Sequence, residues 1–262
     1  MTQTKINQAF GKGRAALMPY FTIGYPDYQT SLDVIEACMA AGADLMELGM
    51  PFSDPLADGP TIQHSTQVAL ENGITVARCL EAVAELRSRE VAIPLILMGY
   101  INPILSYGLG KFVADAAQAG ASGFIIPDLP PEEAGEMQSH CRQQGLDLVF
   151  LLSPNSSDER VRFVTGQSSG FVYLVSVLGI TGERASLPTE LAQFVKRVRA
   201  QTDKPLAVGF GISTPDQAAA VGQVADGVIV GSALVKAAGQ ADDPPTDARD
   251  FVLGLKNALY QP

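Results

Sequence analysis

The residue least expected at its position is Glu47, a carboxylate inside an apolar run. The segment 45–50 has the pattern of a β-strand, in which Leu45, Glu47 and Gly49 share one face. Both faces of a strand in a barrel are covered, so this carboxyl group is desolvated whichever way it points. Burial raises the pKa of a carboxyl group and makes a glutamate a general acid or base near pH 7. The alternative is a structural glutamate paired with a buried Arg or Lys.

Two more carboxylates follow in a loop stiffened by prolines and a glycine. Asp54 and Asp58 lie between Pro51 and Pro60. Two acids in different environments, one buried and one in a loop, can divide proton transfer and charge stabilisation between them. The structural alternatives are a turn residue for Asp54 and a helix cap for Asp58. We favour function for Asp58, and both interpretations stay open for Asp54.

Two glycine-containing turns near the end of the chain have the features of a phosphate site. One, residues 209–214 (GFGIST), follows the seventh apolar run, and the other, residues 230–233 (VGSA), follows the eighth. Free amides and the dipole at a helix N-terminus bind anions. Gly211 and Gly231 allow close backbone approach, and Ser232 adds a hydroxyl donor. The alternative is a pair of tight turns without a ligand.

The elements that must position these residues repeat one pattern: an apolar run, a turn, and an amphipathic helix. There are eight apolar runs, at residues 15–21, 44–48, 95–98, 123–126, 148–152, 171–175, 206–208 and 227–230. Continuous apolar runs are typical of parallel strands buried on both faces. Eight such units predict a single α/β domain over residues 1–262, a (β/α)8 TIM barrel with extra short helices. The rival, a doubly wound open sheet, normally carries GxGxxG after its first strand, and this chain has Thr22–Pro26 there.

Helix boundaries are also predicted from single residues. We expect Pro130-Pro131 and the two glutamates after them to open a helix. Further start signals are Ser157-Asp158-Glu159, Leu187-Pro188 and Ser213–Asp216, and the expected stops are Gly42, Gly73, Gly120, Gly145 and Gly166. The uncharged stretch 91–110 is interrupted by prolines, so we interpret it as a buried strand and its following loop rather than a membrane span.

Composition excludes several classes of partner. With 18 basic and 28 acidic residues the net charge is −10, and nucleic acids and anionic membranes require clustered Lys and Arg. The three cysteines, Cys38, Cys79 and Cys141, are far apart and without metal-ligand spacing, which favours a reducing cytoplasm. The first 14 residues lack the apolar core of a signal peptide. An acidic protein that binds a phosphorylated substrate must rely on local amides and helix dipoles.

The run MELGMPFSDPLADGPTIQ, residues 46–63, resembles the signature of the tryptophan synthase α-subunit family. The resemblance extends in order over nearly the whole chain. It includes Pro19-Tyr20, Gly99–Pro103, Pro127–Pro130, Tyr173, Gly179–Gly182, Gly209–Ser213 and Gly231-Ser232.

This resemblance implies a lyase that cleaves indole-3-glycerol phosphate into indole and glyceraldehyde 3-phosphate. By the same carry-over, Glu47 is the acid and base at indole C3 and at the glycerol hydroxyl. Asp58 binds the indole N–H, and Tyr173 positions Glu47. A C–C bond beside an indole breaks readily once C3 is protonated, which requires an acid in an apolar slot.

The sixth loop, residues 176–187, has the length and glycines of a lid over the substrate. The family resemblance places Thr181 of this loop against Asp58 and Gly182 against the phosphate. The pair Val177-Leu178 is bulkier and more apolar than the family pattern at this place. This difference bears on the motion of the lid and not on the chemistry of the site. Candidates for an apolar indole pocket are Tyr20, Tyr100, Ile125 and Phe210.

The family resemblance also implies a partner. The expected complex is an α2β2 heterotetramer in which a β-subunit carries pyridoxal phosphate, and this chain needs no cofactor or metal. The partner-facing surface is expected to include residues 51–55 and the loop at Asn102-Pro103. Two alternatives stay open: a stand-alone lyase that releases free indole, and a catalytically weak barrel that acts mainly as an allosteric partner. A phosphoribosyl isomerase on the same barrel would share the phosphate site but fits Glu47 and Asp58 poorly.

Overall fold

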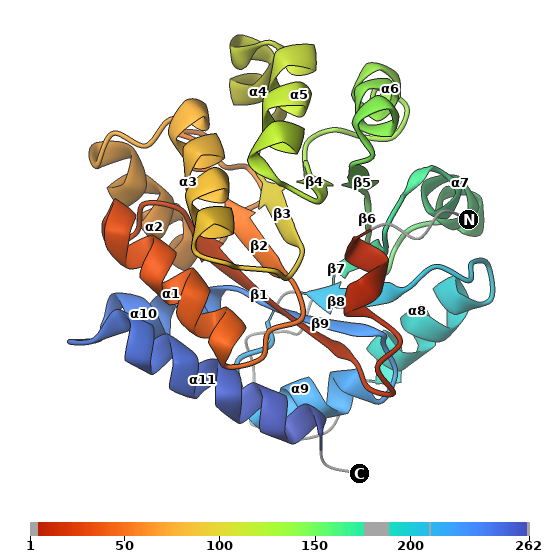
Figure 1. Ribbon diagram of the computed structural model, residues 1–262. Coiled ribbons are helices and arrows are strands. Elements are labelled where there is room, and N and C mark those ends of the chain that lie inside the picture. Colours follow the sequence, from red (N-terminus) through yellow and green to blue (C-terminus); the bar gives the residue numbers. More distant parts are fainter. Residues whose placement is uncertain (1–4, 176–188, 210, 261–262) are drawn as a thin grey trace.

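Parallel strands form the centre of the molecule and helices surround them (Figure 1). The computed structural model describes residues 5–175, 189–209 and 211–260. The strands are β1 (Ala16–Thr22), β2 (Met46–Gly49), β3 (Leu95–Met98), β4 (Gly123–Ile125), β5 (Asp147–Val149), β6 (Leu151–Leu152), β7 (Val172–Val175), β8 (Leu206–Gly209) and β9 (Gly227–Val230). The hydrogen-bonded strand pairs in the described ranges are parallel, as expected of continuous apolar runs.

The strand order closes into a barrel. Hydrogen-bonded neighbours run β5-β4-β3-β2-β1-β9-β8-β7-β6, and β5 and β6 are separated in the chain only by Phe150. These two short strands are therefore the two halves of one staggered barrel strand, which gives the eight positions of a TIM barrel. The predicted fold class is confirmed, and two of the eight predicted strands, 95–98 and 227–230, have the observed bounds.

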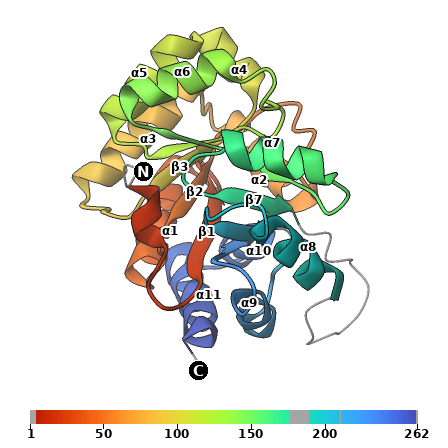
Figure 2. The ribbon, with the colours of Figure 1, turned by 90° about the vertical axis from the view of Figure 1, so that its right-hand side faces the viewer.

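Helices cover the outer face of the barrel (Figure 2). They are α1 (Tyr28–Ala40), α2 (Pro60–Glu71), α3 (Val76–Ser88), α4 (Ile101–Tyr107), α5 (Leu109–Ala119), α6 (Gly135–Gln144), α7 (Asp158–Gln167), α8 (Thr189–Arg199), α9 (Pro215–Gly222), α10 (Ser232–Gly239) and α11 (Pro244–Leu259). A short 3-10 helix, η1 (Ile6–Ala9), comes before β1. Its Ile6 and Ala9 pack with Met18, Leu45 and other buried residues of the barrel interior, so η1 closes the end where the strands begin.

Several boundary predictions are correct because residues at the helix end itself determine them. Ser157 caps α7 by accepting a hydrogen bond from the amide of Arg160. Thr214 and Gln217 form a reciprocal capping box at α9. Gly120 and Gly145 end α5 and α6 in the left-handed conformation.

Three boundary predictions are wrong. The prolines at 130 and 131 do not open α6, which begins at Gly135 after a separate turn. Gly166 does not stop α7, because the helix continues to Gln167 and ends in extended backbone at Ser168. The segment after β3 is not a loop: residues 101–107 form α4, whose first amide is bound by the carboxylate of Asp128. That cap comes from another βα turn and cannot be read from local sequence. The start signal at Leu187-Pro188 lies outside the described residues.

No helix within the described ranges is long and apolar enough to cross a membrane. The three cysteines are buried, as expected of small apolar side chains, and each is a free thiol. Burial raises the pKa of the Cys141 thiol to about 12, which suppresses its reactivity.

Candidate active site

Glu47 lies on β2 with its carboxyl group in the barrel. Its parallel register partners are Tyr20 on β1 and Ile96 on β3, and the residue is 1% exposed. Its Oε1 makes no hydrogen bond with any described residue, and burial raises the pKa of the carboxyl group to about 8. The alternative of a glutamate neutralised by a buried Arg or Lys finds no such cation among the described residues. Burial without a described cationic partner therefore favours the protonated form of Glu47.

Asp58 stands beside Tyr100 at the same end of the barrel. Burial raises the pKa of the Asp58 carboxyl group, and a hydrogen bond with Tyr100 opposes that rise. The Tyr100 hydroxyl also accepts a hydrogen bond from the Ala57 amide at 3.0 Å. Tyr100 therefore holds two consecutive residues of the loop, Ala57 by its backbone and Asp58 by its side chain. The N-cap of α2 is Gly59 without a side-chain bond, so Asp58 is not the helix cap of the structural alternative.

Asp54 is different from Asp58. It is exposed and accepts a hydrogen bond from the hydroxyl of its neighbour Ser53 at 2.5 Å. These are the features of a turn residue, and they favour the structural interpretation of this carboxylate.

Two tyrosines approach the carboxyl pair from different strands. The Tyr20 ring on β1 lies over Gly49, and the Tyr173 ring on β7 lies over Gly209: a methyl group at either glycine would overlap the phenolic oxygen. Burial raises the pKa of both tyrosines, with the charges of Glu47 and Asp58 adding to the effect. The structure thus brings Glu47, Tyr173 and Tyr20 together with the Asp58–Tyr100 pair. A desolvated acid and a second carboxyl group that share the same two tyrosine neighbours can supply a proton to a bound carbon or oxygen atom.

The N-terminus of α10 contains the second turn predicted to bind phosphate. Gly231 precedes the helix against the Tyr20 ring, and Ser232 is the first helical residue. No described side chain caps this terminus, so the first helical amides are left for a ligand. At α9 the Ser213 and Thr214 amides are instead bound by Gln217. In the same turn, Gly211 has a φ of +81°, which favours glycine.

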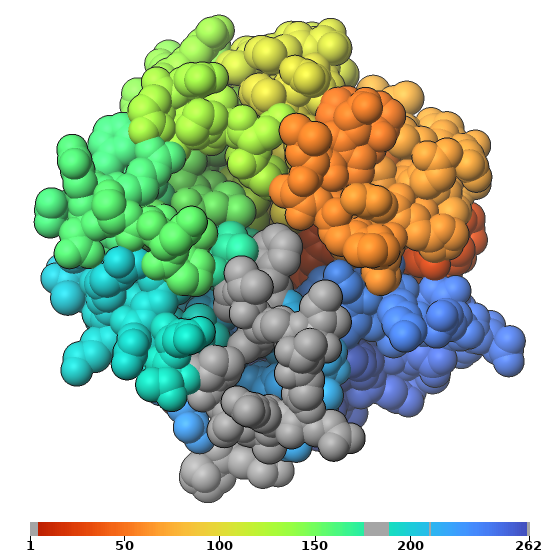
Figure 3. Space-filling view, turned by 180° about the vertical axis from the view of Figure 1, so that it is seen from behind, coloured from red at the N-terminus to blue at the C-terminus, as the bar shows by residue number. Residues whose placement is uncertain are grey.

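Seen from the end where the strands finish, the molecule is hollowed near the centre of the helical ring (Figure 3). Orange residues that follow β2 and blue residues that follow β9 border the hollow, in agreement with the positions of Asp58 and Ser232. Ile125 is fully buried at the end of β4, in the same interior cluster as Tyr173. The predictions on Thr181, Gly182, Phe210 and the Val177-Leu178 pair lie outside the described residues.

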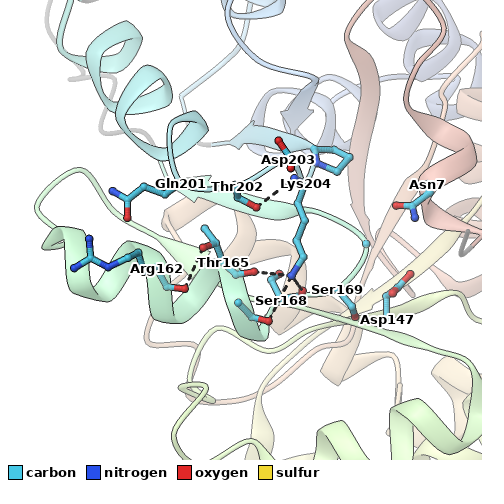
Figure 4. Close-up of a pocket in the computed structure, with 13 residues that line it drawn as sticks. Asn7, Asp147, Arg162, Thr165, Ser168, Ser169, Gln201, Thr202, Asp203 and Lys204 are labelled. Atoms are coloured by element: carbon cyan, nitrogen blue, oxygen red, sulfur yellow. Dashed lines mark hydrogen bonds between the residues drawn. The ribbon is translucent and has the colours of Figure 1, made fainter. Parts of the chain in front are cut away.

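A cavity of about 790 Å³ lies at the opposite end of the barrel, where the strands begin (Figure 4). Its lining includes Asp147 and Lys204, and none of the predicted site residues. The Lys204 ammonium group already donates to the backbone carbonyls of Thr165 and Ser168, at 2.6 Å each. The Lys204 ammonium group thus holds the end of α7. Across the described ranges no cluster of His, Cys, Asp or Glu is arranged to hold a metal ion.

For four residues, the sequence analysis did not predict the packing or hydrogen-bonding role that the structure shows. Gly49 and Gly209 make room for the two tyrosines, while Thr22 and Ser65 bind the Tyr20 hydroxyl in a chain. Residues two apart on a strand share a face, so the position of Gly49 beside Glu47 could be predicted from the sequence. Ser65 is 43 residues from Thr22 in the chain, and no sequence pattern predicts that the two side chains meet.

Comparison with known proteins decides the family. A model of the family described as "Tryptophan synthase alpha chain" matches residues 6–257. The chain belongs to the tryptophan synthase alpha chain family. The resemblance carried by residues 46–63 is therefore confirmed.

Relatives of this family match at nearly full length. The tryptophan synthase alpha chain of Dehalococcoides mccartyi is 49% identical over 256 residues, which cover 98% of this chain and 99% of that protein. The solved tryptophan synthase subunit alpha of Legionella pneumophila superposes with a TM-score of 0.91 at 36% identity, covering 98% of this chain and 99% of the other. A tryptophan synthase structure from M. tuberculosis in an aminoacrylate-bound form superposes with a TM-score of 0.89 at 36% identity. The match covers 98% of this chain and 100% of the other.

Membership in the tryptophan synthase alpha chain family establishes the activity. Proteins of this family are lyases that cleave indole-3-glycerol phosphate in tryptophan biosynthesis. They use no cofactor of their own, and the pyridoxal phosphate of the synthase resides in the beta subunit.

Proposed function

We propose that Glu47 is the acid and base of indole-3-glycerol phosphate cleavage in this chain. The observation that supports this role is a fully enclosed carboxyl group with a pKa near 8, opposite Tyr20 and without a cationic partner among the described residues. In the first step the Glu47 carboxyl group donates its proton to indole C3. The resulting carboxylate then takes the proton of the glycerol hydroxyl on the adjacent carbon. The C–C electron pair returns to the ring, and indole and glyceraldehyde 3-phosphate separate with Glu47 protonated again.

Asp58 and Tyr173 assist that cycle in our proposal. Asp58 accepts the indole N–H and stabilises the positive charge that develops on the ring after C3 is protonated. The contact of Tyr100 with both Ala57 and Asp58 supports a fixed direction for this carboxyl group. Tyr173 packs beside Glu47 and restricts its rotation, with Ile125 and Tyr20 among the apolar walls of the indole slot.

For the phosphate we propose the α10 N-terminus, with Gly231 and Ser232, together with Gly211. The uncapped helix end supports this choice, because the net charge of −10 opposes an anion elsewhere on the molecule. Thr181, Gly182 and Phe210 complete the substrate site in the proposal on the strength of the family resemblance alone.

We also propose that the chain acts as one barrel domain in an α2β2 complex with a beta subunit in the cytoplasm. Apolar side chains on the rim of the site support a protein partner: Leu56 is 90% exposed and Leu105 is 55% exposed. The free, buried thiols support a reducing compartment.

The decisive experiment is an assay of indole formation from indole-3-glycerol phosphate, with and without added beta subunit. We expect Glu47→Gln to lower kcat by about 10² to 10⁴, the range for loss of a general acid–base group. Glu136→Gln, at an exposed glutamate of α6, serves as the control and should retain full activity. Unchanged activity in Glu47→Gln would refute the proton-transfer role. Full activity of the chain alone, with no response to beta subunit, would favour the stand-alone lyase.

A further inference from the structure

Three buried hydroxyl groups form a chain from the active site to helix α2. The Tyr20 hydroxyl lies 3.3 Å from Thr22 Oγ1, and Thr22 Oγ1 lies 2.7 Å from Ser65 Oγ. Ser65 Oγ in turn lies 2.9 Å from the backbone carbonyl oxygen of Ile62. Thr22 and Ser65 have no exposed surface, so water does not compete for these bonds.

The end of the chain fixes the direction of every proton in it. A carbonyl oxygen can only accept a hydrogen bond, so the Ser65 hydroxyl donates its proton to the Ile62 carbonyl oxygen. With Ser65 donating to Ile62, all three bonds form at once only if Thr22 donates to Ser65 and Tyr20 donates to Thr22. The Tyr20 proton consequently points away from the active site, and the phenolic oxygen presents lone pairs there.

Two carboxyl groups and two further phenols surround this oxygen. Glu47 lies opposite Tyr20 in the β1–β2 register, and the charges of Asp58 and Glu47 and the hydroxyl of Tyr100 all act on the phenol. From β7, Tyr173 also lies within electrostatic range, and the uncharged Gly231 of the β9–α10 turn lies against the Cβ end of the Tyr20 side chain. No described cation offsets these groups. An oxygen held as an acceptor disfavours ionisation of a neighbouring carboxyl group, because its negative end faces the charge.

We propose that Thr22 and Ser65 are positioning residues that hold the Tyr20 phenol as an acceptor toward Glu47 and Asp58, and so keep Glu47 protonated for catalysis. The catalytic part of this inference rests on the proposed function of Glu47. The structural part, a phenol whose proton is drawn away from the carboxyl groups, stands on the hydroxyl chain alone. Raised pKa values at both Glu47 and Asp58 agree with it.

The test uses Thr22→Val and Ser65→Ala in the full chain. Either change frees the Tyr20 proton, directly in Thr22→Val and in Ser65→Ala by letting Thr22 donate back to Tyr20. The freed proton can then bind an ionised carboxylate. We expect the pKa of Glu47 to fall by about one pH unit, the shift for one hydrogen bond to a charged group. The pKa is read from the ¹³C carboxyl NMR titration of glutamate-labelled protein, with the Glu47 signal identified by its absence in Glu47→Gln.

Two controls separate orientation from simple damage. Ser31→Ala removes another fully buried serine, which also donates to a carbonyl three residues earlier but does not reach Tyr20. It should leave the Glu47 titration unchanged. In a Tyr20→Phe background, Ser65→Ala should no longer shift the Glu47 pKa, because the phenolic proton is absent.

The outcomes divide cleanly. A shift in both single variants that disappears in Tyr20→Phe supports the proposal, and the pH profile of kcat/KM should then move with the titration. An unshifted Glu47 titration in Thr22→Val and Ser65→Ala overturns it, as does a shift that persists without the phenol. The titration does not depend on turnover, so an active Glu47→Gln would overturn the proposed catalytic role while leaving the hydroxyl chain separately testable.

Discussion

Tyr20 lies directly opposite Glu47 in the parallel register between β1 and β2. The phenol extends along the strand direction to lie over Gly49, two residues beyond Glu47 on the same face. The hydroxyl oxygen of Thr22, the register partner of Gly49, lies 3.3 Å from the phenolic oxygen. Four residues on two adjacent strands therefore fix an acid and the oxygen that faces it.

This arrangement predicts that Gly49→Ala inactivates the protein by displacing Tyr20. The added methyl group would overlap the phenolic oxygen, and an aromatic ring packed in the barrel cannot move away without disturbing its neighbours. We expect indole formation to fall at least tenfold and the free energy of unfolding to fall by about 1–3 kcal/mol. Gly166→Ala is the matched control, because a methyl group there meets nothing within 4 Å. Equal activities for the two variants would contradict the prediction.

The barrel could be predicted from sequence because each of its strands is buried on both faces. Residues 95–98 and 227–230 are short continuous apolar runs. Such runs, repeated between amphipathic helices, are typical of parallel strands that are covered on both faces. The boundaries that failed depend on distant contacts. Helix α4 is capped by Asp128, 27 residues away, and α6 starts after a turn that local rules assign to the helix.

The site divides in the same way. Glu47 and Asp58 are visible in sequence because a carboxylate in an apolar run, followed by a proline-stiffened acidic loop, is rare in a protein core. The pairing of Asp58 with Tyr100, and the chain from Tyr20 to Ser65, join residues 42 to 45 positions apart. Their side-chain types carry no sign of the distance between them, so only the fold reveals these contacts.

A second prediction concerns stability and pH. The pKa of Glu47 rises from 4.5 to about 8 on burial. The folded state binds this proton more tightly than the unfolded state does. The resulting contribution to the free energy of unfolding is fully present below pH 4.5 and is lost as pH rises toward 8. Glu47→Gln should therefore be more stable than wild type by roughly 2–4 kcal/mol at pH 7 to 8, and the difference should disappear near pH 4. Urea unfolding at both pH values measures it. A stability difference that is independent of pH would contradict a raised pKa.

The phosphate site gives a third prediction, Ser232→Asp. A carboxylate at the first position of α10 occupies the place proposed for the substrate phosphate and repels it. The same carboxylate favours the helix N-terminus by about 0.3–1 kcal/mol, so the fold should be retained. We expect KM for indole-3-glycerol phosphate to rise at least tenfold without loss of thermal stability. Ser88→Asp, which adds the same charge at an exposed position at the end of α3, should leave KM unchanged.

The exposed rim provides a fourth prediction. Leu56→Asp places a charge on a side chain that is 90% exposed and therefore contributes little to folding. The activity of the chain alone should change less than twofold, whereas the Kd for beta subunit should rise at least tenfold, as for a central interface residue. Binding is measured by titration with beta subunit. Leu253→Asp on α11, 42% exposed, should leave binding intact. Identical affinities for the two variants would place the partner elsewhere.

A fifth prediction concerns the buried ion pair that joins β1 to the start of β2. The Asp44 carboxylate is 3% exposed and accepts hydrogen bonds from Arg14 at 2.6 Å, Lys12 at 2.8 Å and the Leu17 amide at 2.9 Å. Burial alone would raise the pKa of Asp44, but these bonds outweigh it and lower the pKa below its ordinary value. Asp44→Asn leaves Arg14 without its partner, and we expect the free energy of unfolding to fall by about 3 kcal/mol at pH 7.

The pH dependence of that loss is fixed by the sign of the shift. A lowered folded-state pKa stabilises the protein above the ordinary carboxyl pKa near 4, and this contribution is lost as pH falls further. The difference between wild type and Asp44→Asn should therefore be constant from pH 5 to 7 and shrink below pH 4, the opposite of the Glu47 window. Asp250→Asn removes an exposed ion pair with Arg249 and should cost less than about 1 kcal/mol at any pH. Equal losses for Asp44→Asn and Asp250→Asn in urea unfolding would show that the buried pair adds nothing to the β1–β2 connection.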